Sequence, residues 1–143
     1  MIYLDSCALV KLIREEDESP ALQAWLDERA DEVVITSELA RAEVLRVARR
    51  NNHTERGELI DARKLSADLD EAAAVLEALT QVVVDRKVLD RAGALEAPMV
   101  RTLDAIHLAT ALDLQASAIE FVTYDRRLAP LAQAVGFQVA SPS

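Results

Sequence analysis

The start of the chain contains an abrupt change in the pattern of apolar positions. Residues 1–4 form an apolar run rich in residues that favour β-structure, which predicts a buried strand. From Ser6 onward, apolar residues recur at helical spacing, as at Leu9 and Ile13. This spacing predicts a helix with Ser6 as its N-cap. Asp5 stands where the strand pattern ends, and we expect that strand to be the central one.

The rest of the chain alternates between the two patterns. Further strands are predicted at residues 33–36, 82–84, 119–123 and 137–139. Further helices are predicted at residues 19–28, 38–50, 85–94, 102–114 and 127–134. The segment 55–81 predicts two helices with a break near residues 66–70. Such alternation is typical of a parallel, doubly wound α/β sheet, and we expect residues 1–143 to form one domain.

Composition narrows the class of protein. Half of the residues are hydrophobic (51%), so we expect an ordered core. Cys7 is the only cysteine, which excludes an internal disulfide and a paired-cysteine metal site and favours a reducing cytoplasm. We find no pattern of a signal peptide or a membrane span. The net charge of −9 argues against non-specific DNA coating, but a nucleic-acid enzyme stays open because bound metal ions supply local positive charge.

Acidic residues recur where the predicted strands end. Asp125 follows its strand as Asp5 follows the first, so both are expected at the carboxyl edge of the sheet, where ligands bind in open α/β folds. Asp104 lies in the first turn of the helix 102–114. Each acid also has a purely structural explanation, as a turn or cap residue or as a charge favoured by the helix dipole. His107, one turn after Asp104, is more typical of a packed residue than of a ligand.

Glu43 is more informative than the aspartates. Its helical neighbours Leu39, Ala40 and Val47 are apolar, which places its carboxylate on the face that packs against the sheet. A buried charge without a partner costs several kcal/mol. We therefore expect Glu43 to contact either an arginine, with Arg14 and Arg101 as candidates, or a cation shared with other acids.

A pocket that held all four acids would need positive charge. Two carboxylates about 5 Å apart repel by roughly 3 kcal/mol at an effective dielectric constant of about 20. Four such groups cannot all stay ionised without protons or divalent cations. An all-oxygen set of ligands suits Mg²⁺ or Mn²⁺ rather than zinc.

The order and spacing of these residues resemble those of the PIN-domain nucleases, and most closely the VapC-type toxins of type II toxin–antitoxin systems. The segments that carry the resemblance span nearly the whole chain: Leu-Asp-Ser-Cys-Ala-Leu-Val-Lys at 4–11, Thr-Ser-Glu-Leu at 36–39, Glu-Val-Leu-Arg at 43–46, residues 102–111, and Val-Thr-Tyr-Asp at 122–125. The resemblance implies a three-layer α/β/α sandwich around a mainly parallel five-stranded sheet. It also places an acidic metal site at Asp5, Glu43, Asp104 and Asp125, with Ser6 at a small hydroxyl position beside it.

The resemblance further implies an activity and partners. The chain would be a hydrolase, an endoribonuclease that uses Mg²⁺ or Mn²⁺ to cleave RNA phosphodiester bonds. Asp5 and Asp104 would be the main metal ligands, Asp125 would bind directly or through water, and Glu43 would bind metal or orient the attacking water. A homodimer and a cognate VapB-like antitoxin are also implied.

A group of basic residues follows Glu43 along its helix. Arg46, Arg49, Arg50 and His53 recur at three- and four-residue spacing and form one stripe. The stripe could hold the phosphates of RNA. It could equally be a solvated face whose cations suit a helix C-terminus.

Three other functions compete with the nuclease. A degenerate PIN fold could serve only as a binding scaffold. A receiver-like flavodoxin fold would need an acidic pair after the first strand and a lysine after a late strand, yet no lysine follows Lys87. A haloacid-dehalogenase-type phosphatase would need Asp-x-Asp after its first strand, where Cys7 takes the place of the second aspartate.

Overall fold

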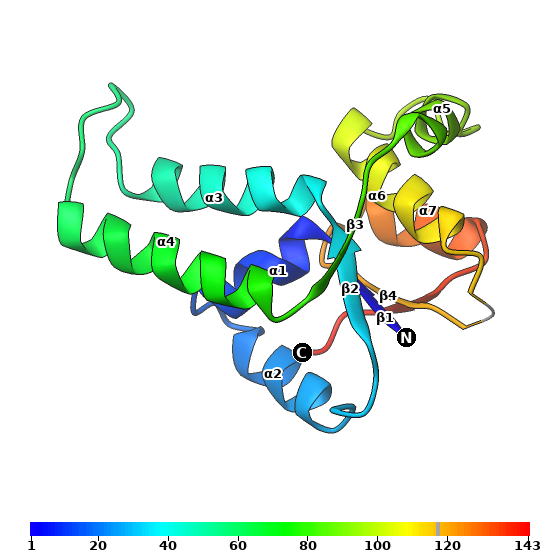
Figure 1. The fold of residues 1–143 in the computed structure, drawn as a ribbon, viewed down its shortest axis with the longest axis horizontal. Coiled ribbons are helices and arrows are strands. Elements are labelled where there is room, and N and C mark those ends of the chain that lie inside the picture. The colour runs from blue at the N-terminus through cyan, green and yellow to red at the C-terminus, as the bar shows by residue number, and fades with distance from the viewer. Residues whose placement is uncertain (117) are drawn as a thin grey trace.

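The apolar run at the start of the chain forms the centre of a five-stranded sheet (Figure 1). In the computed structural model, which describes residues 1–116 and 118–143, β1 (Ile2–Leu4) lies between β2 (Val34–Ser37) and β4 (Glu120–Val122). The outer strands are β3 (Thr80–Val82) beside β2 and β5 (Gln138–Ala140) beside β4. All four pairings are parallel. The structure thus confirms the parallel sheet and the central position of the strand before Asp5.

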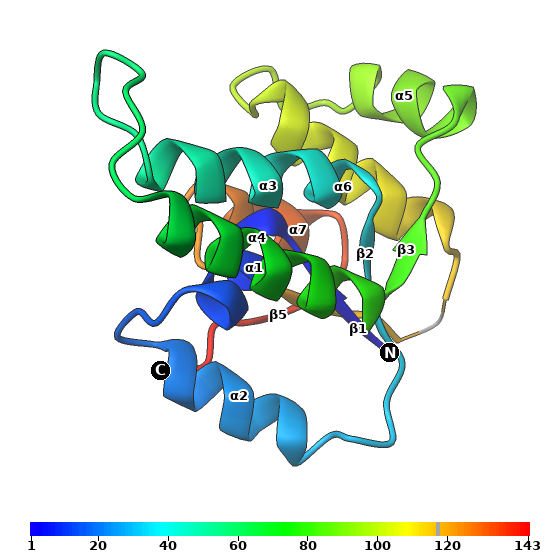
Figure 2. The same cartoon turned by 60° about the vertical axis from the view of Figure 1, so that its left-hand side comes forward.

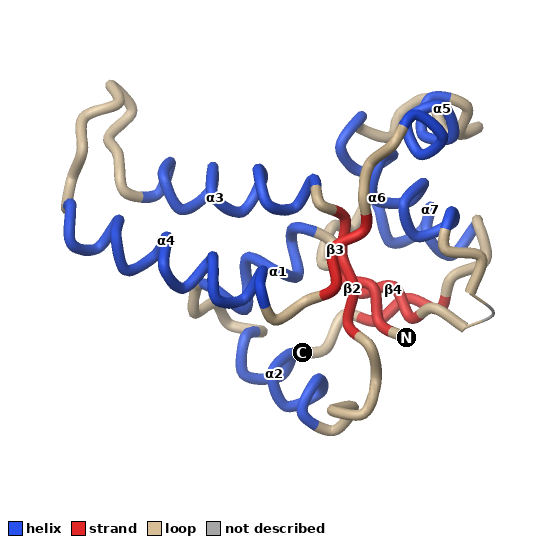
Figure 3. The backbone as a smooth tube through the Cα atoms, viewed as in Figure 1, coloured by secondary structure: helices blue, strands red, loops and turns tan. Residues whose placement is uncertain are grey.

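The two faces of the sheet are covered by different helices, as Figure 3 shows for the strands in red and the helices in blue. Successive residues of a strand point to opposite faces, and Ile2 and Leu4 accordingly pack on one side and Tyr3 on the other. The first side carries α1 (Ser6–Ile13), α2 (Ser19–Asp27), α3 (Leu39–Asn51) and α4 (Ala62–Glu77). The second carries α6 (Thr102–Asp113) and α7 (Leu128–Ala134), with α5 (Arg86–Gly93) packed on α6. This is the expected three-layer α/β/α arrangement.

Helix α4 corrects the prediction for residues 55–81. The helix starts only at residue 62, because the Asp61 side chain caps it by accepting from the backbone N–H groups of Arg63 and Lys64. It then runs without a break through residues 66–70. The polar residues there suggested an interruption, but Asp68 instead accepts hydrogen bonds from Asn52 (2.7 Å) and Lys64 (2.9 Å). These polar groups therefore attach α4 to the end of α3 rather than ending the helix.

The third strand lies two residues earlier than the valine run at 82–84 predicts. Its register is set by parallel pairing with β2, in which Gln81 lies opposite Thr36. The Gln81 side chain also donates to the carbonyl of Leu76, 2.9 Å away. Val83 lies beyond the strand and is 64% exposed. Pairing geometry at the sheet edge thus outweighs local hydrophobicity.

Helices α3 and α4 form a hairpin that extends away from the sheet (Figures 1 and 2). The loop at its tip contains Gly57 with a positive φ of 81°, a conformation that favours glycine. Across the described residues, no helix combines the length and the hydrophobicity needed to cross a membrane.

Candidate active site at the carboxyl edge of the sheet

Asp5 is fixed at the junction of β1 and α1. One carboxylate oxygen accepts from the backbone N–H of Ala8 (2.8 Å), and the other accepts from the hydroxyl of Thr123 (2.5 Å). Asp5 is therefore the N-cap of α1, and Ser6, which the sequence predicted as the cap, is the first helical residue. The reason is that Asp5 keeps the extended backbone of the strand (ψ 175°) and carries a side-chain acceptor. Sequence analysis missed Thr123, which follows β4.

Burial makes the charge of Asp5 unfavourable. The residue is only 2% exposed. Burial raises the pKa of its carboxyl to about 6, although the hydrogen bonds from Thr123 and Ala8 oppose the rise. The negative charge of Asp104 raises the pKa further. A positive charge placed beside Asp5 would restore its ionised form.

Glu43 on α3 meets a histidine rather than an arginine. Its Oε2 atom lies 2.7 Å from Nε2 of His107 on α6, and Nδ1 of His107 lies 2.9 Å from the hydroxyl of Tyr3 on β1. His107 is 1% exposed and Tyr3 is fully buried, while the Glu43 side chain keeps 16% exposure. The expectation of Arg14 or Arg101 as the partner is therefore wrong, because α6 brings His107 into the position that either arginine would have taken.

The contacts of His107 define one consistent pattern of donors and acceptors. A neutral ring can accept the Tyr3 O–H at Nδ1 and donate its Nε2–H to Glu43, which satisfies all three side chains. His107 is packed, as the sequence predicted, but it also orients an acid of the site. The sequence feature that could have indicated this role is the position of His107 one turn after Asp104, because residues three apart on a helix share a face.

Asp104 and Asp125 complete the group of acids. Asp104 is half-buried in the first turn of α6, and burial raises the pKa of its carboxyl, as do the charges of Asp125 and Glu43. Asp125 follows β4, and its Oδ1 accepts from the backbone N–H groups of Arg127 (2.7 Å) and Leu128 (3.3 Å). Asp125 therefore also serves as a turn residue, the structural role that the sequence left open for it.

Cys7 lies in the first turn of α1, two residues after Asp5. Desolvation raises the pKa of its thiol to about 12, and the charges of all four carboxylates contribute to the rise: Asp5, Asp125, Asp104 and Glu43. These four acids come from four separate parts of the chain, and their charges all act on the same thiol.

The acids suit a hydrated cation held by one or two carboxylates better than an ion bound by all four. Among the residues that the structure describes, no group of three or more His, Cys, Asp or Glu side chains is arranged so that it could hold a metal ion. Mg²⁺ usually keeps several waters and uses only one or two carboxylates directly. The carboxylate oxygens and the raised pKa values of Asp5 and Asp104 fit a cation of that kind. Direct ligation by all four acids at once does not fit.

A cavity of about 660 Å³ opens beside the acids, between α1 and α3. Glu43, Ser6 and Cys7 lie in its wall, together with two residues of the predicted basic stripe, Arg46 and Arg50. The other two stripe residues, Arg49 and His53, are not part of the wall, and the ring of His53 instead lies 2.6 Å from the carbonyl oxygen of Arg49. Two of the four stripe residues thus share a cavity wall with Glu43.

Comparisons with known proteins agree on one family. A family profile described as PIN domain matches residues 2–133. Ribonuclease VapC46 of Mycobacterium tuberculosis is 44% identical over 142 residues, which cover 99% of this chain and 98% of that protein. The solved structure of FitAcB from Neisseria gonorrhoeae gives a TM-score of 0.75 at 18% identity, over 99% of this chain and 98% of that one. VapBC2 from Rickettsia felis, bound to a DNA fragment from its promoter, gives 0.72 at 14% identity over all of both chains. The two structural comparisons concern the fold alone.

Proposed function

This chain belongs to the PIN-domain family, among the VapC ribonucleases, and on that premise we propose that it is a metal-dependent endoribonuclease acting as the toxin of a type II toxin–antitoxin pair. The observations that support the proposal are the position of Asp5 and Asp125 directly after adjacent parallel strands, and the charges of Asp104 on Asp5 and of Asp125 and Glu43 on Asp104. Burial raises the pKa of Asp5. Such a site gains stability when it takes up positive charge.

Each acid has a proposed role in the reaction. Asp5 and Asp104 would hold Mg²⁺ or Mn²⁺, with Asp125 binding directly or through water. When bound, the cation would polarise the phosphate and favour ionisation of a water. Glu43, oriented by His107 through the 2.7 Å contact, would bind the cation or align the attacking water.

Hydrolysis of this kind has a defined product. The water oxygen forms a bond to phosphorus, and the bond from phosphorus to the 3′ oxygen breaks. The 3′ oxygen takes up a proton, so the products carry a 5′-phosphate and a 3′-hydroxyl. No serine nucleophile is required.

The cavity between α1 and α3 would hold part of the RNA. Arg46 and Arg50 lie in its wall, where guanidinium groups can pair with phosphates. Ser6 could donate its hydroxyl to the same strand. Arg49 belongs to the same helix but lies outside the cavity wall, so Arg49→Ala is the matched control for Arg46→Ala and Arg50→Ala. Only the latter two should reduce the salt dependence of RNA binding, by about 0.7 in the logarithmic slope for each lost contact.

The decisive experiment compares wild type with Asp5→Asn on mixed cellular RNA. Each protein is incubated with Mg²⁺ or Mn²⁺ and with EDTA, and the 5′ ends of the products are mapped. Discrete cuts that require both the cation and Asp5 are expected, and Asp68→Asn, the same change in a carboxylate on α4, should cut like wild type. Calorimetry with Mn²⁺ gives a second measure. If neither cleavage nor Mn²⁺ binding occurs, the acids are structural and the chain is a PIN-fold scaffold.

The proposal extends to partners. A VapB-like antitoxin would neutralise the toxin, and the net charge of −9 favours a partner with a basic surface. A homodimer is also proposed. Light scattering of the chain alone, and of the chain with its antitoxin, at low and high salt would measure both assemblies, and a monomer at all concentrations would contradict the dimer.

A further inference from the structure

A second cavity has one of the four acids, Asp104, in its wall. It has a volume of about 320 Å³ and lies between the loop before α6 and the start of α7. Asp104 forms part of its wall, whereas Glu43 lines the larger cavity. Acids of the proposed site thus contribute to the walls of two separate cavities.

Two arginines line this second cavity next to the acids. Arg101 lies close enough to Asp104 for its positive charge to lower the pKa of that carboxyl, against the rise caused by burial and by Asp125. Arg127 has its Nε atom 4.0 Å from Asp125 Oδ1, while its side chain stays 72% exposed. Neither guanidinium is buried, so both can pair with a phosphate. In a chain of net charge −9, these two arginines bring positive charge next to Asp104 and Asp125.

The rest of the cavity lining is largely apolar. Met99 is 91% exposed, and Pro98 and Leu131 line the cavity with it. A flexible methionine adapts to a flat ligand. Nucleic-acid bases stack on apolar side chains and on arginine planes once they leave the helical stack. Apolar walls with two arginines therefore match the base and the phosphate of a nucleotide.

We propose that this cavity is a nucleotide-binding subsite of the ribonuclease. One unpaired base would rest against Met99 and Pro98, and the adjacent phosphate would lie between Arg101 and Arg127. The volume is near the lower limit for ligand pockets, which suits one base and not several. The target RNA is then single-stranded or looped at this position. This inference rests on the proposed ribonuclease function.

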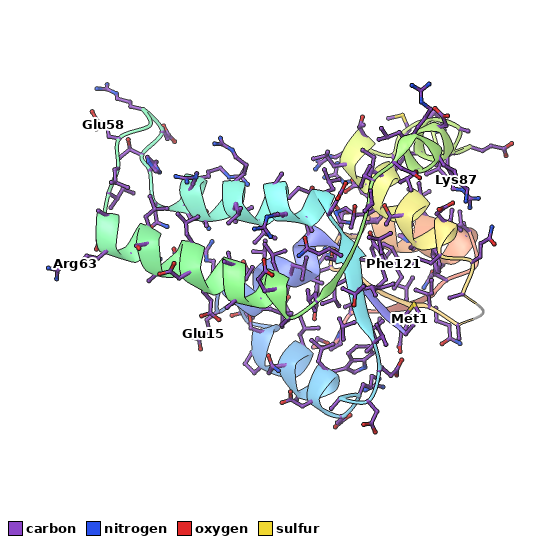
Figure 4. The ribbon with its side chains drawn as sticks, in the orientation of Figure 1. Met1, Glu15, Glu58, Arg63, Lys87 and Phe121 are labelled. Carbon is purple, nitrogen blue, oxygen red and sulfur yellow. The ribbon has the colours of Figure 1, made fainter. Side chains whose placement is uncertain are left out.

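The two methionines of the chain provide a direct test. Met1 and Met99 are the only ones, so a protein labelled with ¹³C in the methionine methyl groups gives two assignable signals. Met1 precedes β1, and its carbonyl oxygen accepts from the backbone N–H of Glu120 at the start of β4. It thus lies at the amino edge of the sheet, whereas Asp5 and Asp125 follow the carboxyl ends of their strands. Met1, labelled in Figure 4, therefore serves as the internal control.

The experiment adds a short single-stranded RNA of mixed sequence to the full-length Asp5→Asn protein, which should bind without cleaving. A base stacked on Met99 shifts its methyl signal upfield through the ring current, and the Met1 signal should stay in place. The same RNA annealed to its complement should leave the Met99 signal unchanged. Fluorescence anisotropy on the same samples measures binding independently.

Two neighbouring arginines provide a matched pair of variants. Arg127→Ala removes a charge from the cavity wall, whereas Arg126→Ala removes the same charge one residue away, from a side chain that does not line the cavity. Arg127→Ala should lower the salt slope of RNA binding by about 0.7 and weaken the upfield shift of Met99. Arg126→Ala should change neither. Equal effects of the two variants would contradict the subsite.

Each other outcome is also decisive. If RNA binds but the Met99 signal does not move, the subsite is wrong and the ribonuclease proposal stands. If the Met99 signal moves with protein concentration in the absence of RNA, the cavity is covered by a second copy of the chain and the subsite is again wrong. If the wild type with Mg²⁺ or Mn²⁺ neither binds nor cuts RNA, the ribonuclease function itself fails, and the subsite fails with it.

Discussion

Asp5 and Asp68 are both hydrogen-bonded carboxylates, but their surroundings shift their pKa values in opposite directions. Asp68, between α3 and α4, accepts from Asn52 and pairs with Lys64. The hydrogen bond from Asn52 and the charge of Lys64 hold its pKa below the usual range. Asp5 is bonded only by uncharged donors, Ala8 and Thr123, and burial raises its pKa to about 6. The charge of Asp68 is compensated by a neighbouring lysine, whereas no lysine or arginine pairs with Asp5 among the described residues.

Asp5→Asn should make the protein more stable. The rise of the Asp5 pKa from 3.8 to about 6 corresponds to roughly 3 kcal/mol of unfavourable free energy for the ionised form at neutral pH. The amide removes this charge and can still accept from Ala8. Urea denaturation at neutral pH without divalent cations should show a gain of about 1–3 kcal/mol. Mg²⁺ should stabilise the wild type and reduce the difference. A loss of stability in Asp5→Asn would contradict the comparison.

The pH dependence of stability sharpens the same contrast. Because the pKa of Asp5 is raised in the folded protein, its contribution is fully present below the unfolded value of about 3.8 and is lost as the pH rises through about 6. The wild type should therefore lose stability relative to Asp5→Asn between about pH 4 and pH 7. Because Asp104 interacts with Asp5, the difference between the two denaturation curves reports the titration of Asp5 together with its coupling to Asp104. A difference that stays constant with pH would show that Asp5 is not the responsible group.

His107 should affect catalysis more than stability. Gln places its amide near the Nε2 position and can still donate to Glu43, whereas Asn places its amide near Nδ1, beside Tyr3. Both variants bury a similar amide, so their thermal stabilities should be alike. Loss of a group that orients a metal-site acid typically costs about 10–100-fold in activity or metal affinity. We expect this loss in kcat and in Mn²⁺ affinity for His107→Asn, with His107→Gln closer to wild type. Equal activities would make His107 a packing residue only.

A substitution beside Asp68 should lower the stability of the protein without affecting cleavage. Asn52 is 1% exposed and donates to the carbonyl of Ala48 (2.8 Å) as well as to Asp68. Asn52→Ala removes a hydrogen bond to a charged group, worth about 1.5–3 kcal/mol, and it should lower the midpoint of urea denaturation. Per-molecule cleavage at a temperature where the variant stays folded should be unchanged. Reduced cleavage under those conditions would mean that the α3–α4 hairpin is coupled to the acids.

The alternation of strands and helices, the central place of the first strand and the position of Asp5 and Asp125 after their strands could be predicted, because they depend on periodicity and on the resemblance to a family. The start of α4 and the register of β3 could not, because they depend on contacts such as Asn52 with Asp68 and on pairing with β2. The same holds at the site. Asp5 followed from its place after a strand, but the His107 partner of Glu43 joins residues 64 positions apart, and no local pattern encodes that contact.

The smallest expected effect concerns Lys64, and it tests which partner compensates Asp68. The Lys64 side chain is 62% exposed and precedes Asp68 by one turn, the less favourable order for such a pair. Lys64→Ala should therefore cost only about 0.3–0.5 kcal/mol, measured by urea denaturation, and salt should abolish the difference. If the loss instead approached that of Asn52→Ala, the charge of Lys64 rather than the buried amide would hold Asp68. Compensation of this carboxylate would then be electrostatic, and Asp5 would differ from it only in lacking a lysine.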